Sequence, residues 1–137
     1  MKYSVSSLSK DCKLPRSRIL RGRESIQRLF RTGKALKEQH LDMRYLIFPG
    51  SEDACQMAFI TGKKLGKAHR RNLLRRRMKE AYRKHQHLIR NIALAEQLGF
   101  HGILIAKKAD IPYRIIEKEC INLLTLAAKA MKKGGTD

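Results

Sequence analysis

The chain has 137 residues, an apolar share of 42% and a formal net charge of +19. This length predicts one domain, and the apolar share is too high for wholesale disorder. So strong a positive charge favours a polyanionic partner, with nucleic acid first and an anionic membrane surface second. There is no run of about 20 apolar residues and no apolar signal core, so the sequence predicts a cytoplasmic protein without a membrane partner.

The first part of the chain divides into a tail and a short helix. Residues 1–15 read as a flexible polar N-terminal tail, residues 16–132 as a single α/β domain and residues 133–137 as a short C-terminal tail. Within the domain, RESIQRLFRTG predicts a helix, because Ile26, Leu29 and Phe30 fall on one face. Gly33 is expected to end this helix in the usual C-terminal manner.

Three strands are predicted. Apolar and polar residues alternate from His40 to Phe48, which indicates a half-buried strand. After the turn at Pro49–Asp53, a second strand over Cys55–Thr61 is expected to pair back as a hairpin. The continuous apolar run Gly102–Ala106 predicts a central strand that is buried on both faces.

The most unusual stretch is Lys63–Arg90, which holds 12 of the 31 Lys and Arg residues and a single acid, Glu80. A helix is predicted from Lys67 to His87, and a helical wheel gives it two faces. The apolar face consists of Leu74, Met78, Ala81, Tyr82, His85 and Ile89. The basic face consists of Asn72, Arg75, Arg76, Lys79 and Arg83.

The last part of the chain completes the predicted fold. Asn91–His101 reads as a loop or a short helical extension, and a final helix is expected over Tyr113–Lys132. Its inner face is formed by Ile116, Cys120, Leu123, Leu124, Ala127 and Ala130. The order helix, strands, helix, strand, helix predicts a two-layer α/β (α+β) sandwich with a small mixed sheet of about four strands covered by helices.

Several kinds of site are disfavoured. The run Gly62–Ala68 fails the phosphate-loop pattern, because three residues rather than four separate its first two glycines and Ala68 follows the lysine. His69, His85 and His87 lack Cys or acid residues at metal-ligand spacing. The three isolated cysteines indicate free thiols. No spacing indicates a nucleophile paired with a base, so we expect neither a catalytic residue nor a metal or cofactor bound by protein side chains.

RNA contact is the preferred reading of the basic face. A merely solvated helix face normally mixes charge signs, because ion pairs four residues apart stabilise it. Arginine can grip phosphate through two hydrogen bonds and can stack on bases. Duplex DNA is less favoured, because the chain shows no helix-turn-helix pair with a free recognition helix. Ile26 and Phe30 suit either the core or, with Tyr45, a stacking platform for an unpaired strand.

The central run GKKLGKAHRRNLLRRRMKEAYR resembles the signature of the bacterial ribonuclease P protein subunit, and the resemblance covers about residues 16–132. Leu73 stands where that family has the second arginine of an Arg-Asn-Arg core, and we expect Arg70 or Arg77 to supply this cation. The family often has an aromatic at the position of Ile26. The matching residues are Lys63, Lys64, Gly66, Lys67, Arg71, Asn72, Arg75, Arg76 and Lys79.

The resemblance implies an α/β sandwich with a left-handed βαβ crossover, and a protein that assists a catalytic RNA in removing the 5′ leader of precursor tRNA. The RNA and its Mg²⁺ ions would carry the hydrolysis, and no obligate protein partner is evident. A cleft formed by Ile26, Phe30 and Tyr45 would receive the leader. The residues expected to bind RNA are Lys63, Lys64, Lys67, Arg70, Arg71, Asn72, Arg75, Arg76, Lys79 and Arg83. A ribosomal or other structural RNA-binding protein is the alternative.

Overall fold

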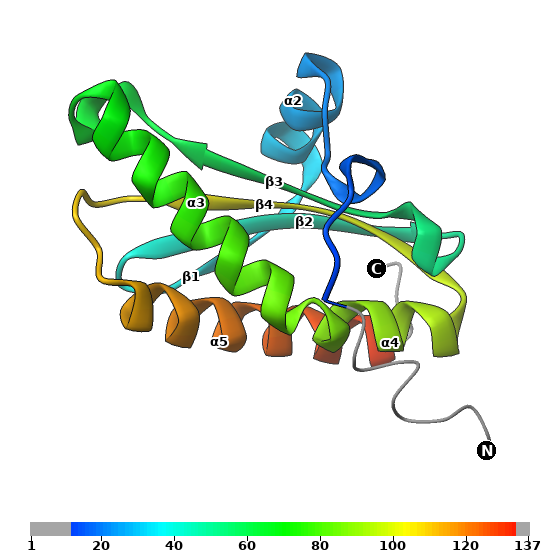
Figure 1. Ribbon diagram of the computed structural model, residues 1–137. Coiled ribbons are helices and arrows are strands. Elements are labelled where there is room, and N and C mark those ends of the chain that lie inside the picture. The colour runs from blue at the N-terminus through cyan, green and yellow to red at the C-terminus, as the bar shows by residue number, and fades with distance from the viewer. Residues whose placement is uncertain (1–11, 134–137) are drawn as a thin grey trace.

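A mixed four-stranded sheet forms the centre of the protein, and the computed structural model describes residues 12–133 (Figure 1). The strands lie in the order β1-β2-β4-β3. Their bounds are Lys34–Lys37 for β1, Leu41–Pro49 for β2, Cys55–Thr61 for β3 and Leu98–Ala106 for β4. The α-helices are α2 (Arg23–Thr32), α3 (Ala68–His85), α4 (His87–Glu96) and α5 (Tyr113–Lys132). Three 3-10 turns, η1 (Arg16–Arg18), η2 (Glu52–Ala54) and η3 (Lys63–Leu65), complete the elements.

The pairing of β3 differs from the hairpin that its position after β2 predicts. β4 lies between the two strands, antiparallel to β2 and parallel to β3. Ala58 of β3 is the register partner of Ile103 of β4. The hairpin prediction is therefore wrong, and β3 becomes an edge strand. The physical reason is burial: β4 is the most apolar strand, and the central position covers it on both faces.

The prediction of a central strand over Gly102–Ala106 is confirmed, and the strand begins earlier, at Leu98. The preceding segment, expected to be a loop or helical extension, is divided between α4 and the start of β4. The sequence does not predict β1, a strand of four residues that pairs with β2. Its residues are mostly exposed, so they do not alternate between apolar and polar as a half-buried strand does.

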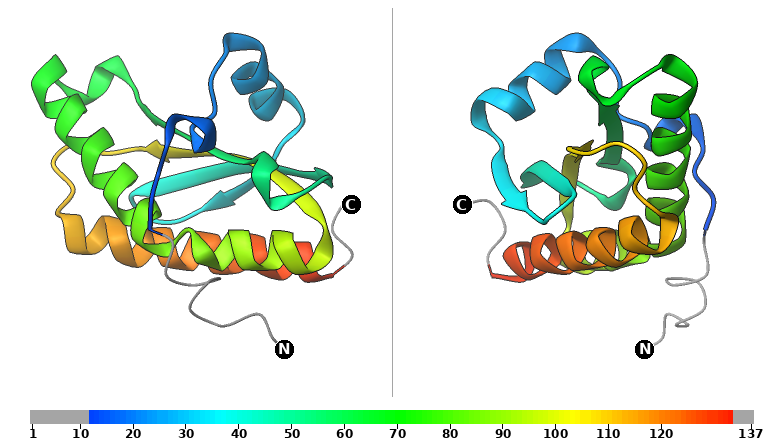
Figure 2. Two further views of the ribbon diagram at one scale, coloured as in Figure 1. Left: turned by 45° about the vertical axis from the view of Figure 1, so that its right-hand side comes forward. Right: turned by 90° about the vertical axis from the view of Figure 1, so that its left-hand side faces the viewer.

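One face of the sheet is covered by α3, α4 and α5, and the main core lies beneath them (Figure 2). The apolar face predicted for the basic helix is confirmed at Leu74, Met78, Ala81 and Tyr82, all buried. The helix ends at His85, and Ile89 is buried as part of α4. The predicted bounds of the last helix agree with α5.

α2 lies on the opposite face of the sheet, apart from α3 and α5 (Figure 2). Its one buried residue, Leu29, packs with Ile103 of β4 in a second, smaller core. The expected C-terminal glycine cap is only partly right. Gly33 does end α2, but its φ of −73° is not left-handed. Glycine is needed there for space instead, because a Cβ would press on the carbonyl oxygens of Leu29 and Tyr45.

The segment directly before η1 packs against the domain, although it was predicted to belong to the tail. Leu14 contacts the main core, and the Lys13 carbonyl accepts hydrogen bonds from Arg18 and Gln86. Most of the predicted tail, residues 1–11, lies outside the described residues, as do residues 134–137. Within residues 12–133, no helix is long and apolar enough to cross a membrane. All three cysteines are free.

Candidate nucleic-acid interface

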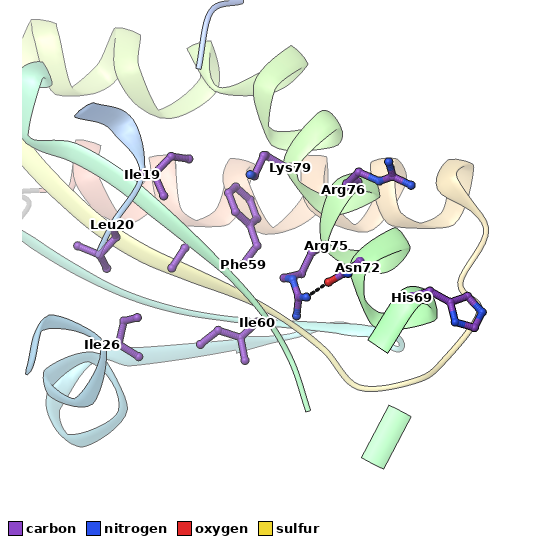
Figure 3. A pocket seen from close by; sticks show the side chains of 11 residues that line it. Ile19, Leu20, Ile26, Phe59, Ile60, His69, Asn72, Arg75, Arg76 and Lys79 are labelled. Carbon is purple, nitrogen blue, oxygen red and sulfur yellow. Dashed lines mark hydrogen bonds between the residues drawn. The ribbon is translucent and has the colours of Figure 1, made fainter. Parts of the chain in front are cut away.

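A cleft of about 610 Å³ lies along the edge strand β3, between α2 and the segment after η1 on one side and α3 on the other (Figure 3). We call it the α3 cleft. Its lining residues are Ile19, Leu20, Ile26, Ala58, Phe59, Ile60, His69, Asn72, Arg75, Arg76 and Lys79. One wall is apolar and the other is basic, and no lining residue carries a carboxylate. Such a combination suits a strand that has both bases and phosphates.

The basic wall arises from the period of α3. Residues 72, 75, 76 and 79 recur three or four positions apart, so they share one side of a helix whose other side carries Leu74 and Met78 into the core. Four of the five residues on the predicted basic face therefore do line one cleft. Figure 3 shows them on α3, across from the apolar side chains of Ile19, Leu20 and Ile26.

Arg75 is the most constrained cation of this wall. Its Nη1 donates to the Thr61 hydroxyl oxygen at 2.9 Å, and its Nη2 donates to the side-chain oxygen of Asn72. Thr61 is the last residue of β3, so this bond ties α3 to the end of the edge strand. The guanidinium is therefore fixed on the basic wall of the cleft, and the side-chain amide of Asn72 keeps its two N–H donors for a ligand.

Further cations surround the start of α3. Lys63 and Lys64 lie on η3, Lys67 precedes the helix, and all three are exposed. Arg71 donates from Nε to the Gly66 carbonyl at 3.0 Å, which braces the turn between η3 and α3. The first turn of α3 contains no acid, so the partial positive charge of the helix N-terminus adds to these side chains.

The two arginines expected to compensate for Leu73 both contact the loop between β4 and α5. Arg70 pairs with Asp110, and Arg77 donates from Nη1 to the Ile111 carbonyl at 2.7 Å. Neither lines the α3 cleft. Leu73 itself is 40% exposed. Whether Arg70 also contacts RNA stays a prediction, whereas the geometry assigns Arg77 to the loop.

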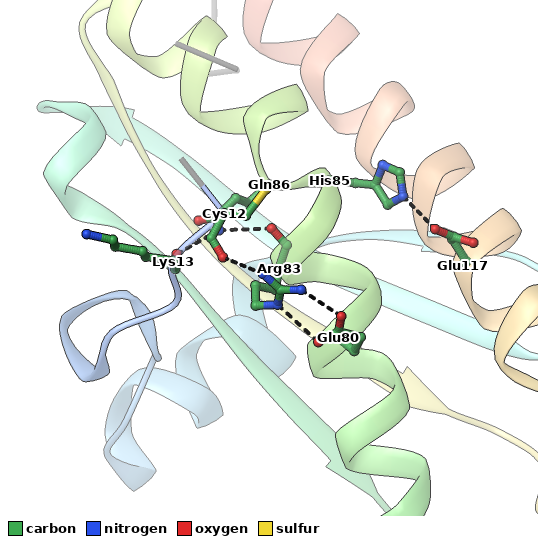
Figure 4. Close-up of polar contacts among 7 residues, drawn as sticks. All are labelled: Cys12, Lys13, Glu80, Arg83, His85, Gln86 and Glu117. Carbon is green, nitrogen blue, oxygen red and sulfur yellow. Dashed lines mark hydrogen bonds and ion pairs between the residues drawn. The ribbon is translucent and has the colours of Figure 1, made fainter. Parts of the chain in front are cut away.

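Arg83, the fifth residue of the predicted basic face, lies outside the α3 cleft (Figure 4). Two of its nitrogens donate to the carboxylate of Glu80, at 2.7 and 3.0 Å, and a third donates to the Cys12 carbonyl at 3.0 Å. The hydrogen bonds from Arg83 lower the pKa of Glu80. The single acid of the basic stretch thus offsets a cation that also holds the N-terminal segment.

The three residues predicted to form a leader cleft separate in the structure. Ile26 lines the α3 cleft and also packs against the smaller core. Phe30 is 43% exposed beside Arg44, whose guanidinium carbon lies 5.8 Å from the ring centroid. Tyr45 is only 4% exposed and stacks on Phe100 in the main core, so its prediction as a cleft residue is wrong. The alternation along β2 turns it to the face away from α2.

The sequence did not predict that the segment after η1 and strand β3 contribute to this cleft. Ile19 forms an isolated parallel bridge with Met57, and Leu20 donates its N–H to the Met57 carbonyl at 3.0 Å. These contacts bring η1 to the edge of the sheet. No local signal could have shown this, because it depends on β3 being an edge strand.

The side chains of the α3 cleft are suited to binding. Within residues 12–133, no three His, Cys, Asp or Glu residues gather in a way that could hold a metal ion. The cleft offers cations, amide donors and an apolar wall, which are the groups that bind an unpaired nucleic-acid strand.

Comparison with known proteins agrees with this picture. The family model described as Ribonuclease P matches residues 14–128. The ribonuclease P protein component of Chloroflexus aggregans is 31% identical over 112 residues, covering 82% of this chain and 78% of that protein. The corresponding component of Chlorobaculum tepidum is 35% identical over 99 residues, covering 68% of this chain and 64% of that protein.

Solved structures share the fold. The RNase P protein of Staphylococcus aureus superposes with a TM-score of 0.64 at 19% identity, covering 80% of this chain and 94% of that one. The RNase P protein of Thermotoga maritima gives a TM-score of 0.63 at 23% identity, covering 79% and 96%. Both therefore support the mixed sheet and its helices.

Proposed function

Because the chain belongs to the ribonuclease P protein family, we propose that it binds the catalytic RNA of ribonuclease P together with the 5′ leader of precursor tRNA, and so assists removal of that leader. The observation that carries this proposal is the α3 cleft, where a basic wall faces an apolar wall. The basic wall suits phosphates and the apolar wall suits unpaired bases.

The proposal divides the work between protein and RNA. The protein would raise the affinity of the catalytic RNA for precursor tRNA, because added cations offset the repulsion between two RNA molecules. The RNA would hold the Mg²⁺ ions and perform the hydrolysis. The donor set of the described residues supports this division, since it offers no cluster of acids or histidines for a metal. We place this reaction in the cytoplasm.

Two surfaces would share the RNA. The α3 cleft suits the single-stranded leader, with Asn72, Arg75, Arg76 and Lys79 on its basic wall. The cations before and within the first turns of α3, most of them exposed, suit the catalytic RNA, because they lie near the helix N-terminus. They are Lys63, Lys64, Lys67, Arg70 and Arg71.

The experiment is leader removal by the catalytic RNA at low Mg²⁺, with and without the protein. We expect the protein to accelerate cleavage, and to bind a precursor with a leader more tightly than the same tRNA without one. An Arg76→Glu variant should lose most of this gain. Lys118→Glu changes the charge by the same amount on the exposed side of α5 and should retain it.

Two outcomes would count against the proposal. An unchanged cleavage rate would exclude assistance to this RNA. Equal affinity for tRNA with and without the leader would favour the alternative, a structural RNA-binding protein that recognises folded RNA through charge alone.

A further inference from the structure

A second pocket lies on the other side of α2, away from the α3 cleft. Its volume is about 520 Å³, and it opens between α2 and the ends of β2 and β4. We call it the α2 pocket. It is lined by Arg28, Thr32, Leu46, Ile47, Phe48 and His101. None of these residues lines the α3 cleft, and the proposed function leaves the pocket without a role.

The pocket contains two aromatic rings packed edge to face. The centroids of Phe48 and His101 are 4.8 Å apart, with an interplanar angle of 72°. Both side chains are only partly buried. Two rings that meet edge to face form a corner. A flat ligand can stack on the face of one ring and touch the edge of the other.

The position of Phe48 depends on a glycine. Its ring lies directly over Gly99 of β4, and a Cβ at that position would overlap three atoms of the ring. Any other residue at position 99 would push the ring away from β4. The corner between Phe48 and His101 thus depends on Phe48 and its register partner Gly99, which lie on neighbouring strands.

The rim of the pocket is basic. Arg28 and Thr32 come from α2, and no lining residue carries a carboxylate. Arg28 also lines an adjoining hollow of about 320 Å³ with Glu24, Ser25 and Arg31. One arginine, Arg28, therefore lines the pocket beside the aromatic corner, and a second arginine and an acid, Arg31 and Glu24, line only the adjoining hollow. Burial and the nearby Arg28 lower the pKa of His101, so its neutral ring offers one N–H donor and one acceptor.

We propose that the α2 pocket binds one unpaired nucleobase of an RNA strand, stacked on Phe48, with the attached phosphate on Arg28. The pocket volume lies within the range of small-ligand sites, and base stacking on an aromatic side chain tolerates any base. The proposal rests on the proposed function only in taking RNA as the partner. It assigns a second contact, separated by α2 from the cleft for the leader.

The test is titration of the isotope-labelled chain with AMP, observed by nuclear magnetic resonance, without any catalytic RNA. We expect the signals of Thr32, Phe48 and His101 to shift together. Phe48→Leu should weaken AMP binding at this site by about tenfold, the loss of one stacking contact. Arg114→Gln, on the exposed start of α5, should leave it unchanged, whereas Arg28→Gln, which removes the same charge, should weaken it.

Titrations with adenosine and with inorganic phosphate test the base and the phosphate of AMP separately. Adenosine should still shift Phe48 and His101 in the Arg28→Gln variant, which keeps the test valid if Phe48→Leu does not fold. If inorganic phosphate reproduces all the shifts made by AMP, or if AMP shifts only signals of the α3 cleft, the proposal is overturned. Because no cleavage is measured, its failure is distinct from failure of the proposed leader function.

Discussion

Single residues of the α3 cleft are expected to contribute differently to RNA binding. The salt dependence of the RNA affinity can distinguish their contributions. Arg76 and Lys79 are exposed and line the cleft, so each is free to meet one phosphate. We expect Arg76→Ala and Lys79→Ala each to reduce the slope of log affinity against log salt by about one unit for single-stranded RNA. An Arg114→Ala variant is the matched control. Slopes that match the wild type would show that these side chains point away from the strand.

Glu119 is a buried acid whose role is structural. Its carboxylate accepts hydrogen bonds from the backbone N–H groups of His40 and Leu41, both at 2.9 Å, and contacts the His40 ring nitrogen at 2.7 Å. It therefore joins α5 to the turn between β1 and β2. Burial raises the pKa of Glu119, but these hydrogen bonds outweigh burial, and the net pKa lies below 4.5.

This lowered pKa gives a prediction with a definite sign. A carboxyl group with a depressed folded-state pKa stabilises the fold above its ordinary pKa, and this stabilisation is lost as pH falls through the folded pKa. Glu119→Gln should therefore be less stable than the wild type at neutral pH, and the difference should shrink below about pH 4. Urea unfolding at several pH values checks it. A difference that is constant with pH would contradict the assignment.

At the scale of the element, α3 performs two tasks with two faces. Met78 has no exposed surface and lies in the main core, one residue from the cleft residue Lys79. Met78→Ala should lower the free energy of unfolding by about 2–5 kcal/mol, because it leaves a cavity. Lys79→Ala should change it by less than about 0.5 kcal/mol. Similar losses for both variants in urea unfolding would show that the two faces are not separate.

The segment Cys12–Pro15 is a second element whose role was not expected. Leu14 packs on the core, and the Lys13 carbonyl accepts from the side-chain amide of Gln86, which is only 1% exposed. A chain that begins at Arg16 should be less stable than one that begins at Cys12, by about 1–3 kcal/mol, since it leaves one of the two side-chain N–H groups of the buried Gln86 unpaired. Thermal unfolding of the two chains measures this. Equal Tm values would mean that the contacts are negligible in solution.

For the whole molecule, the net charge of +19 makes stability depend on the partner. RNA that binds only the folded state should raise the Tm by several degrees at low salt, because saturation at 100 times Kd contributes about 2.7 kcal/mol. This gain should largely disappear near 1 M salt, where charges are screened within about 3 Å. An uncharged polysaccharide at equal mass is the control. A gain that persists at high salt would point to recognition without phosphate contacts.

The two faces of α3 follow from helical period alone, which assigns Leu74 and Met78 to the core and Arg75 and Arg76 to the basic face. Tyr45 shows what strand alternation cannot predict. Strand alternation grouped it with Leu41 and Met43, but nothing in that pattern said which face of the sheet α2 would cover.

The sequence by itself determined the α+β class, the bounds of α5, the central place of β4 and the polarity of α3, because these depend on local period and on runs of apolar residues. Only the tertiary structure decided that β3 is an edge strand parallel to β4, that η1 joins it, and that α2 separates two pockets. These features depend on contacts between residues far apart in the chain, and no local pattern encodes which strands pair. The cleft exists because of those pairings.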